Sequence, residues 1–198
     1  VCVDDDYVCG EGEKALPESP SIESVIVAGG TREGWTSYES LLEEGSEDWV
    51  RPAGDKATKN SDIMLIYFTS GTTGMAKAVC HSFVHPLGHI ITAKYWQQVQ
   101  EDRLHMSVSD SGWAKFGWGK IYGQWICGAT VFAYDMDKFV PAKLLQKIQD
   151  YKLTTFCAPP TMYRFMLQED VERYDLSSVA NFATAGEPLN AEVTLAWE

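Results

Sequence analysis

The sequence lacks three features, each of which would assign it to a class of protein. None of its apolar runs approaches the ~18 residues of a membrane-spanning helix. The first ten residues, VCVDDDYVCG, have neither the basic start nor the apolar centre of a signal peptide. The five cysteines are dispersed and form no C-x-x-C pair, which argues against a zinc site or a disulfide framework. These absences predict a cytoplasmic protein with reduced thiols and no membrane span.

Positive charge is also scarce, and the charge is unevenly distributed. The 198 residues carry a formal net charge of -12, and residues 1–62 hold 15 acidic and 5 basic side chains. A protein that binds nucleic acid needs a basic surface to neutralise phosphates, so we expect no nucleic-acid partner. The acidic side chains are expected to form a solvated face. The length is typical of roughly one domain of ~100–200 residues.

Apolar stretches alternate with helical patterns along the chain. Strands are predicted at 22–28, 63–69, 104–109, 129–134, 154–160 and 181–186, and helices at 37–44, 81–100, 112–128, 141–152 and 161–170. Such alternation is typical of right-handed βαβ units. We therefore predict an α/β fold with a mostly parallel sheet and helices on its faces. Residues 1–62 are predicted to be an acidic leading segment with one strand, and residues 63–198 an α/β subdomain of the same domain.

One loop has an unusual composition, YFTSGTTGMAKAV at residues 67–79. Gly71 and Gly74 allow backbone N–H groups to turn toward one point, and such nests bind anions. Hydroxyl residues add neutral donors, and Lys77 adds a compact positive charge. In parallel α/β sheets, ligands bind beyond the carboxyl ends of strands, where this loop is expected. The residues predict a polyphosphate site, but a plain turn from strand to helix also explains them, and the P-loop consensus is not met.

Three segments, in the same order along the chain, resemble those of one enzyme superfamily. YFTSGTTGMAK is similar to the phosphate-binding signature of adenylate-forming enzymes, which include acyl-CoA synthetases, luciferases and peptide-synthetase adenylation domains. Ala76-Lys77-Ala78 replaces the usual Pro-Lys-Gly. SDSGWAKFGWGKIYGQWICGATV, residues 109–131, resembles the Asp-x-Gly-Trp region of acetyl- and medium-chain acyl-CoA synthetases, and APPTMYRFML with TAGEPLN resembles their adenine-binding stretch. The resemblance favours that branch and implies part of the large domain of an adenylate-forming enzyme.

The resemblance implies roles for particular residues. It places the phosphates of ATP on Thr69, Ser70, Gly71, Thr72, Thr73, Gly74 and Lys77. It places adenine against Gly186, Glu187 and Pro188, and it borders the acyl and pantetheine channel with Trp113, Ala114, Lys115 and Ala185. Packing of a helix against the sheet explains Trp113 equally well, and we prefer that interpretation for Trp118 and Trp125. A cation such as Lys115 sits poorly in an apolar channel; it can face solvent, pair with Asp110, or meet a carboxylate or a CoA phosphate.

The implied reaction has two steps. A carboxylic acid attacks the α-phosphorus of ATP, bound with Mg²⁺, to give acyl-AMP and pyrophosphate, and the thiol of coenzyme A then displaces AMP. Such transfers need positioning and charge neutralisation, so no catalytic side chain is predicted within these residues. His81, His85 and His89 have i, i+4, i+8 spacing, but no carboxylate or cysteine completes a ligand set, and no metal ligand is predicted.

Several superfamily segments do not follow Pro188: a Thr-Glu segment, a ribose-binding aspartate and a C-terminal domain with a lysine. We therefore expect a central piece of an acyl-CoA synthetase that is inactive by itself. Three alternatives remain open at this point. They are another adenylating ligase for aryl or amino acids, a module that binds nucleotide or acyl-CoA without turnover, and a structural α/β domain with a coincidental loop.

Overall fold

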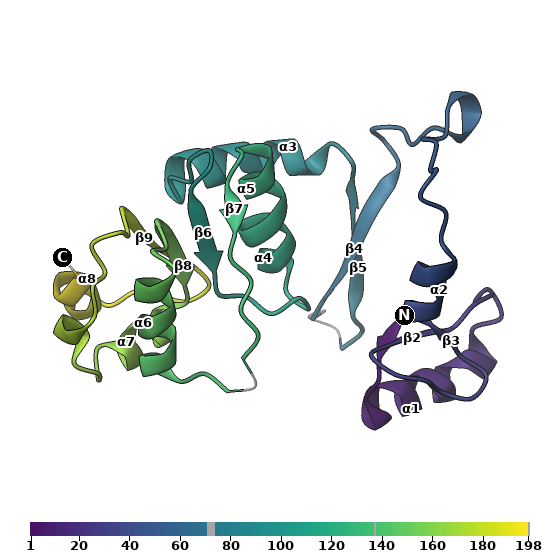
Figure 1. Cartoon of the computed structure of the whole chain (residues 1–198), viewed down its shortest axis with the longest axis horizontal. Helices are drawn as coiled ribbons and strands as arrows, with labels where there is room; N and C mark the ends of the chain where they lie inside the picture. The colour runs from purple at the N-terminus through teal and green to yellow at the C-terminus, as the bar shows by residue number, and fades with distance from the viewer. Residues whose placement is uncertain (71–73, 137, 198) are drawn as a thin grey trace. The chain divides into compact units, whose positions relative to one another are not determined.

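The structure is a computed structural model that describes residues 1–70, 74–136 and 138–197, and it has two compact units, residues 1–57 and 58–198 (Figure 1). The division lies slightly before the predicted boundary at residue 62. Local hydrogen bonds explain the difference, because the Lys59 N–H donates to the Asp62 carboxylate (2.8 Å) and the Phe83 N–H donates to the Asp62 carbonyl (3.2 Å). Residues 58–62 are thereby joined to the chain that follows them.

The first unit contains three short parallel strands where the sequence predicts one. They are β1 (Cys2–Val3), β2 (Ile26–Ala28) and β3 (Thr36–Ser37), in the order β1-β2-β3. β2 is the longest of the three, and Val27 at its centre is fully buried. β1 and β3 have two residues each, too few to show a period of two in the sequence. Helices α1 (Asp6–Ala15), η1 (Leu16–Glu18), α2 (Tyr38–Glu44) and η2 (Gly54–Lys56) complete the unit.

A parallel four-stranded sheet forms the centre of the second unit. Its strands are β6 (Leu104–Ser107), β7 (Thr130–Val131), β8 (Thr155–Ala158) and β9 (Asn181–Thr184), in the order β7-β6-β8-β9 (Figure 1). Its connections contain α4 (Ala114–Phe116), the π-helix η4 (Gly117–Ile121), α5 (Tyr122–Ile126), α6 (Pro141–Asp150), α7 (Pro160–Met166) and η5 (Val171–Arg173). α8 (Ala191–Trp197) follows β9. The predicted α/β fold with parallel strands and helices is confirmed.

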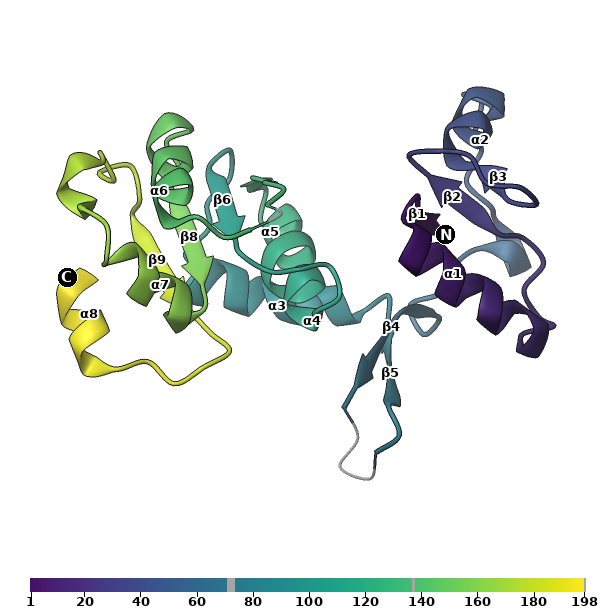
Figure 2. The same ribbon diagram turned by 90° about the horizontal axis from the view of Figure 1, so that it is seen from below.

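One face of this sheet is apolar. Met106 and Phe156 are paired in the β6–β8 register, and both are almost fully buried with Leu144, Leu145 and Ile148 of α6. Figure 2 shows α6 and α7 beside β8 and β9. α6 begins at Pro141, as the sequence predicts, because a first-turn N–H needs no partner within the helix. This packing supplies the largest cluster of buried side chains in the described residues.

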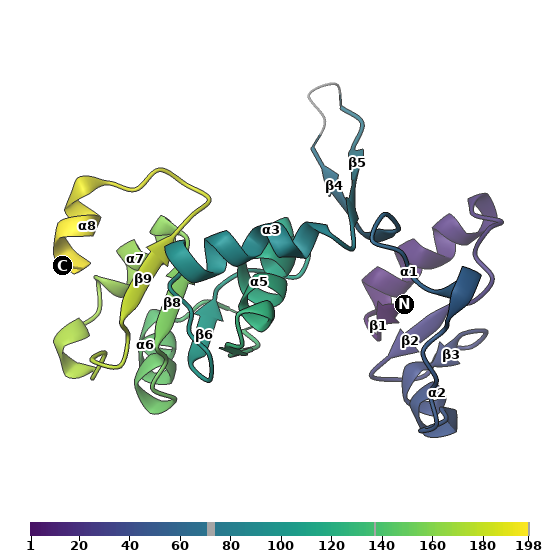
Figure 3. The same cartoon turned by 90° about the horizontal axis from the view of Figure 1, so that it is seen from above.

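The opposite face of the same strands is polar, although it is also buried. His105 Nδ1 lies 2.8 Å from Thr155 Oγ1, and its Nε2 lies 3.1 Å from Ser107 Oγ. The Gly119 carbonyl in η4 accepts hydrogen bonds from Ser107 Oγ (2.7 Å) and from the side-chain amides of Gln97 (2.7 Å) and Gln124 (3.0 Å). Helices α3 (His85–Ile91), η3 (Thr92–Trp96) and α5 lie on this side (Figure 3). The bonds to Gly119 fix η4 against the sheet.

An antiparallel hairpin precedes α3, which corrects one prediction. β4 (Ile63–Thr69) is the predicted strand, but β5 (Lys77–Ser82) pairs with it, and Thr69 lies opposite Lys77 (Figure 2). The prediction of a helix over 81–100 is therefore wrong at its start, and the helical segment also ends earlier than predicted, at Trp96. Residues 77–82 gain backbone hydrogen bonds from β4 that a helix prediction based on spacing cannot include. The loop that contains Gly74 joins two strands and not a strand to a helix.

Burial of His105 makes stability depend on pH. Removal from water lowers the pKa of His105 to about 4 from its ordinary value of 6.5. The unfolded chain therefore binds more protons in this range, so the free energy of unfolding should fall as pH falls from about 6.5 to about 4. Burial lowers the pKa of His81 and His89 as well, which acts in the same direction. Urea titrations of the wild type and of His105→Gln across this range measure the contribution of His105. An identical pH dependence in both proteins would contradict the prediction.

Candidate functional site

The carboxyl ends of the four parallel strands meet at one edge of the sheet. The connection after β6 leads to β7 on one side, whereas the connection after β8 leads to β9 on the other. Open α/β sheets bind ligands at such a change of direction, beyond the strand ends. Two adjoining cavities occur there, and Val108, Ser109, Asp110 and Met162 line both. This edge is therefore the candidate site of the second unit.

The smaller cavity has a volume of about 390 Å³ and brings together two predicted groups of residues. Trp113 and Lys115 come from the connection after β6, and Ala185, Gly186 and Glu187 come from the connection after β9. The other lining residues are Val108, Ser109, Asp110, Pro159 and Met162. Ala114 and Pro188 are exposed and do not line this cavity. Two of the three segments singled out in the sequence therefore share one site.

The carboxylate of Glu187 is held by the first turn of α7. It accepts hydrogen bonds from the Thr161 backbone N–H (3.2 Å) and from the Thr161 hydroxyl, and Arg164 Nη2 lies 3.5 Å from it. The residue before it, Gly186, has φ of +102°, a conformation that favours glycine. A Cβ built on Gly186 meets no atom within 4 Å. The side chain of Glu187 thus fixes the segment, while the backbone at Gly186 faces open space.

Lys115 and Asp110 line the same cavity without forming an ion pair. The Asp110 carboxylate accepts a hydrogen bond from the Gly112 N–H at 2.8 Å. None of the ion pairs among the described residues includes Lys115, which is half-buried. The structure therefore does not show the ion pair with Asp110 that was one of the alternatives for Lys115.

Four of the seven predicted phosphate-binding residues lie at the end of the β4–β5 hairpin. Thr69, Ser70, Gly74 and Lys77 are exposed, and they do not line either cavity at the sheet edge. Gly71, Thr72 and Thr73 lie outside the described residues. The hairpin packs on η4, where the rings of Tyr67 and Trp118 are 6.4 Å apart. The structure therefore does not bring the described loop residues to the cavity residues.

Trp118 is buried, as the packing interpretation predicts, but that interpretation is wrong for Trp125, whose position on α5 leaves it 59% exposed. The rings of His81, His85 and His89 surround Trp118 at centroid distances of 4.9, 4.5 and 5.2 Å.

In the described part of the chain, no group of three or more His, Cys, Asp or Glu side chains is arranged to hold a metal ion. Likewise, no helix within the described ranges is long and apolar enough to cross a membrane.

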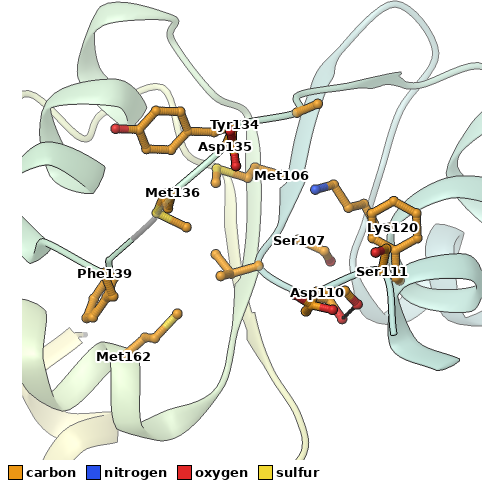
Figure 4. A pocket seen from close by; sticks show the side chains of 14 residues that line it. Met106, Ser107, Asp110, Ser111, Lys120, Tyr134, Asp135, Met136, Phe139 and Met162 are labelled. Atoms are coloured by element: carbon orange, nitrogen blue, oxygen red, sulfur yellow. Dashed lines mark hydrogen bonds between the residues drawn. The ribbon is translucent and has the colours of Figure 1, made fainter. Parts of the chain in front are cut away.

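The larger cavity, of about 600 Å³, contains residues that the sequence analysis missed (Figure 4). It is lined by Met106, Ser107, Val108, Ser109, Asp110, Ser111, Phe116, Lys120, Ala133, Tyr134, Asp135, Met136, Phe139 and Met162. Many of these residues directly follow β6, β7 or β8. The rule that ligands bind at the carboxyl ends of parallel strands could have identified these residues. Applying it requires the order of the strands in the sheet, which cannot be read from the sequence.

Comparisons with known proteins agree with the geometry. A family model described as "AMP-binding enzyme" matches residues 3–198. Human mitochondrial acyl-coenzyme A synthetase ACSM3 is 34% identical over 87% of this chain and 29% of its own length, and human mitochondrial acyl-coenzyme A synthetase ACSM4 is 35% identical over 93% and 32%. The chain thus spans about a third of the curated relatives it matches. The resemblance to acyl-CoA synthetases is confirmed.

Solved structures show the same fold. The anthranilate CoA ligase AuaEII in complex with anthranoyl-AMP matches 98% of this chain and 37% of its own with a TM-score of 0.80 at 24% identity. A luciferase-like enzyme from the nonluminescent Zophobas morio mealworm matches 96% and 43% with a TM-score of 0.71 at 26% identity. The fold is therefore that of adenylate-forming enzymes.

One prediction is contradicted by the relatives. The sequence analysis predicts a cytoplasmic protein, whereas the synthetases named above are mitochondrial. Amino-acid composition and the spacing of cysteines do not determine the compartment in which a protein is found. Because the family match spans almost all of its residues, the chain belongs to the family of AMP-binding enzymes.

Proposed function

We propose that the chain is part of an acid–thiol ligase that activates a carboxylic acid with ATP and transfers the acyl group to coenzyme A. The cavity that unites Trp113 and Lys115 with Ala185, Gly186 and Glu187 carries this proposal, because it joins the two segments that resemble acyl-CoA synthetases. The identity to ACSM3 and ACSM4, 34% and 35%, exceeds the 26% to the luciferase-like enzyme. A thioester-forming ligase is therefore preferred over other adenylating enzymes.

The adenine of ATP is proposed to lie against residues 186–188. Gly186 leaves open space beside the backbone, and Glu187 is already held by Thr161 and Arg164. A flat base can approach a backbone that carries no side chain, and its amine and ring nitrogens can bond to backbone groups. The side chain of Glu187 thus positions this segment, and the backbone of Gly186, Glu187 and Pro188 binds the adenine.

The phosphates of ATP are proposed to bind at the end of the hairpin, at Thr69, Ser70, Gly71, Thr72, Thr73, Gly74 and Lys77. Thr69 and Lys77 face each other in the β4–β5 register, and Gly74 has φ of +88°. A cation, a hydroxyl and turned N–H groups near one point suit a triphosphate. ATP arrives as its magnesium complex, and we assign no residue to the metal, because no group of described side chains is arranged to hold one.

The acid and the pantetheine arm of coenzyme A are proposed to enter beside Trp113, Ala114, Lys115 and Ala185. The reacting carboxylate attacks the α-phosphorus, pyrophosphate leaves, and the CoA thiol then displaces AMP. In this scheme the residues 63–198 bind and orient the reactants, and residues 1–62 belong to the same domain. Charge neutralisation and positioning account for the rate, and no side chain forms a covalent intermediate.

The products test this proposal directly. The complete natural polypeptide that contains these residues is incubated with ATP, coenzyme A and a panel of straight-chain and aromatic acids. We expect AMP and an acyl-CoA thioester in equal amounts, detected by mass spectrometry, and neither product when the acid is omitted. Formation of ADP in place of AMP, or nucleotide binding without any thioester, would contradict the proposed function.

A further inference from the structure

Lys120 is a buried cation in the wall of the larger cavity. The residue is only 7% exposed, and none of the ion pairs among the described residues includes it. Its Nζ atom lies 5.2 Å from the ring centroid of Phe116, and Figure 4 shows the ammonium group directed into the cavity. A buried charge without a charged partner is costly. The position of Lys120 therefore favours an anion bound from the cavity.

The backbone that carries Lys120 is fixed. The carbonyl of the preceding residue, Gly119, accepts hydrogen bonds from Ser107, Gln97 and Gln124. All three donors are themselves at most 1% exposed. The network therefore fixes the backbone from which the Lys120 side chain extends into the cavity wall.

Four apolar side chains of the cavity suit the apolar body of a ligand. They are those of Met106, Met136, Phe139 and Met162. Two carboxylates, Asp110 and Asp135, also line the cavity; that of Asp110 accepts a hydrogen bond from the Gly112 N–H, and neither forms one of the ion pairs among the described residues with Lys120. Because Val108 and Met162 line both cavities, an acid that starts beside Ala185 can continue past them toward Lys120. Such a ligand has one polar end in each cavity and an apolar centre.

We propose that Lys120 binds a second carboxylate at the far end of the substrate acid, so that the enzyme favours dicarboxylic acids over monocarboxylic acids of equal length. The inference rests on the proposed function, because it takes the reacting carboxylate to lie in the smaller cavity. The substrate class is thus an α,ω-dicarboxylic acid with an apolar chain.

Kinetics with octanedioate and octanoate test the inference in the complete natural polypeptide. The wild type should use octanedioate at least as well as octanoate. Lys120→Met keeps an unbranched apolar stem over Phe116 and removes the charge. Loss of this charge-assisted contact should lower kcat/KM for octanedioate about 10- to 100-fold. The kcat/KM for octanoate should change little. Calorimetric binding of octanedioate in the absence of ATP should weaken in parallel.

Two further variants keep the test interpretable. Lys120→Arg retains the charge and should retain the preference for octanedioate. Lys94→Met is the matched control, since Lys94 also lies in a π-helix and near an aromatic ring but is exposed and outside both cavities. This variant should leave kcat/KM for both acids unchanged. Thermal unfolding of each variant verifies that it is folded.

The possible failures are distinguishable. If the wild type forms thioesters from octanoate but rejects octanedioate, the inference is overturned and the proposed function stands. If Lys120→Met lowers activity equally with both acids, Lys120 has only a structural role. If it instead raises the KM for coenzyme A, its anion is a CoA phosphate, and the inference is wrong. If no acid of any class yields a thioester, the proposed function fails, and the inference fails with it.

Discussion

Replacing Lys77 with alanine is expected to slow formation of acyl-AMP about 10- to 100-fold, the loss that follows from removing one charge-assisted contact to phosphate. Lys77 is exposed at the end of the hairpin, opposite Thr69, where no described carboxylate pairs with it. Its charge is therefore available for a ligand. The rate is measured with the complete natural polypeptide under saturating acid, with a single turnover of labelled ATP.

The second half-reaction provides the control for Lys77. Thioester formation from preformed acyl-AMP should be nearly unchanged in Lys77→Ala, because pyrophosphate has already left. Lys143→Ala removes an equally exposed lysine from α6 and should affect neither half-reaction. An unaltered rate of adenylation in Lys77→Ala would remove this lysine from the mechanism. A matching loss in both half-reactions would indicate a general structural defect.

Leu144→Ala is expected to lower the free energy of unfolding by about 2–5 kcal/mol, the usual cost of emptying a filled core position. Leu144 is fully buried and belongs to the cluster that includes Met106 and Phe156 of the sheet. Domains are typically stable by only ~5–15 kcal/mol, so the loss should be evident in urea denaturation. Lys143→Ala, the adjacent exposed position on α6, should change stability by no more than about 0.5 kcal/mol. A cost for Leu144→Ala as small as that of the control would show that α6 does not pack as described.

The elements that were predictable are those whose local pattern and tertiary environment agree. All four residues of the strand at Thr155–Ala158 are buried, three of them apolar, and Pro141 marks the start of α6. The strand predicted at 181–186 is also present, although it ends at Thr184, and Ala185, Gly186 and Glu187 follow it where the cavity lies. In these regions the local preference and the packed structure favour the same conformation.

The misses arise where a distant partner decides the conformation. β5 is a strand because it pairs with β4, and β1 and β3 are strands because they pair with β2. The larger cavity and Lys120 depend on the order β7-β6-β8-β9, which brings segments far apart in sequence to one edge. Nothing in the spacing of Lys120 distinguishes it from an exposed lysine. Its importance appears only with its burial.

Carboxylate-dependent exchange of labelled pyrophosphate into ATP is the most direct test of the central claim, since exchange requires that an acid, ATP and the enzyme form acyl-AMP reversibly. The complete natural polypeptide containing these residues is assayed without coenzyme A, with and without each acid of the panel. The account predicts label in ATP that depends on the acid and is strongly reduced in Lys77→Ala. Exchange that is absent with every acid, or equally fast when the acid is omitted, would contradict it.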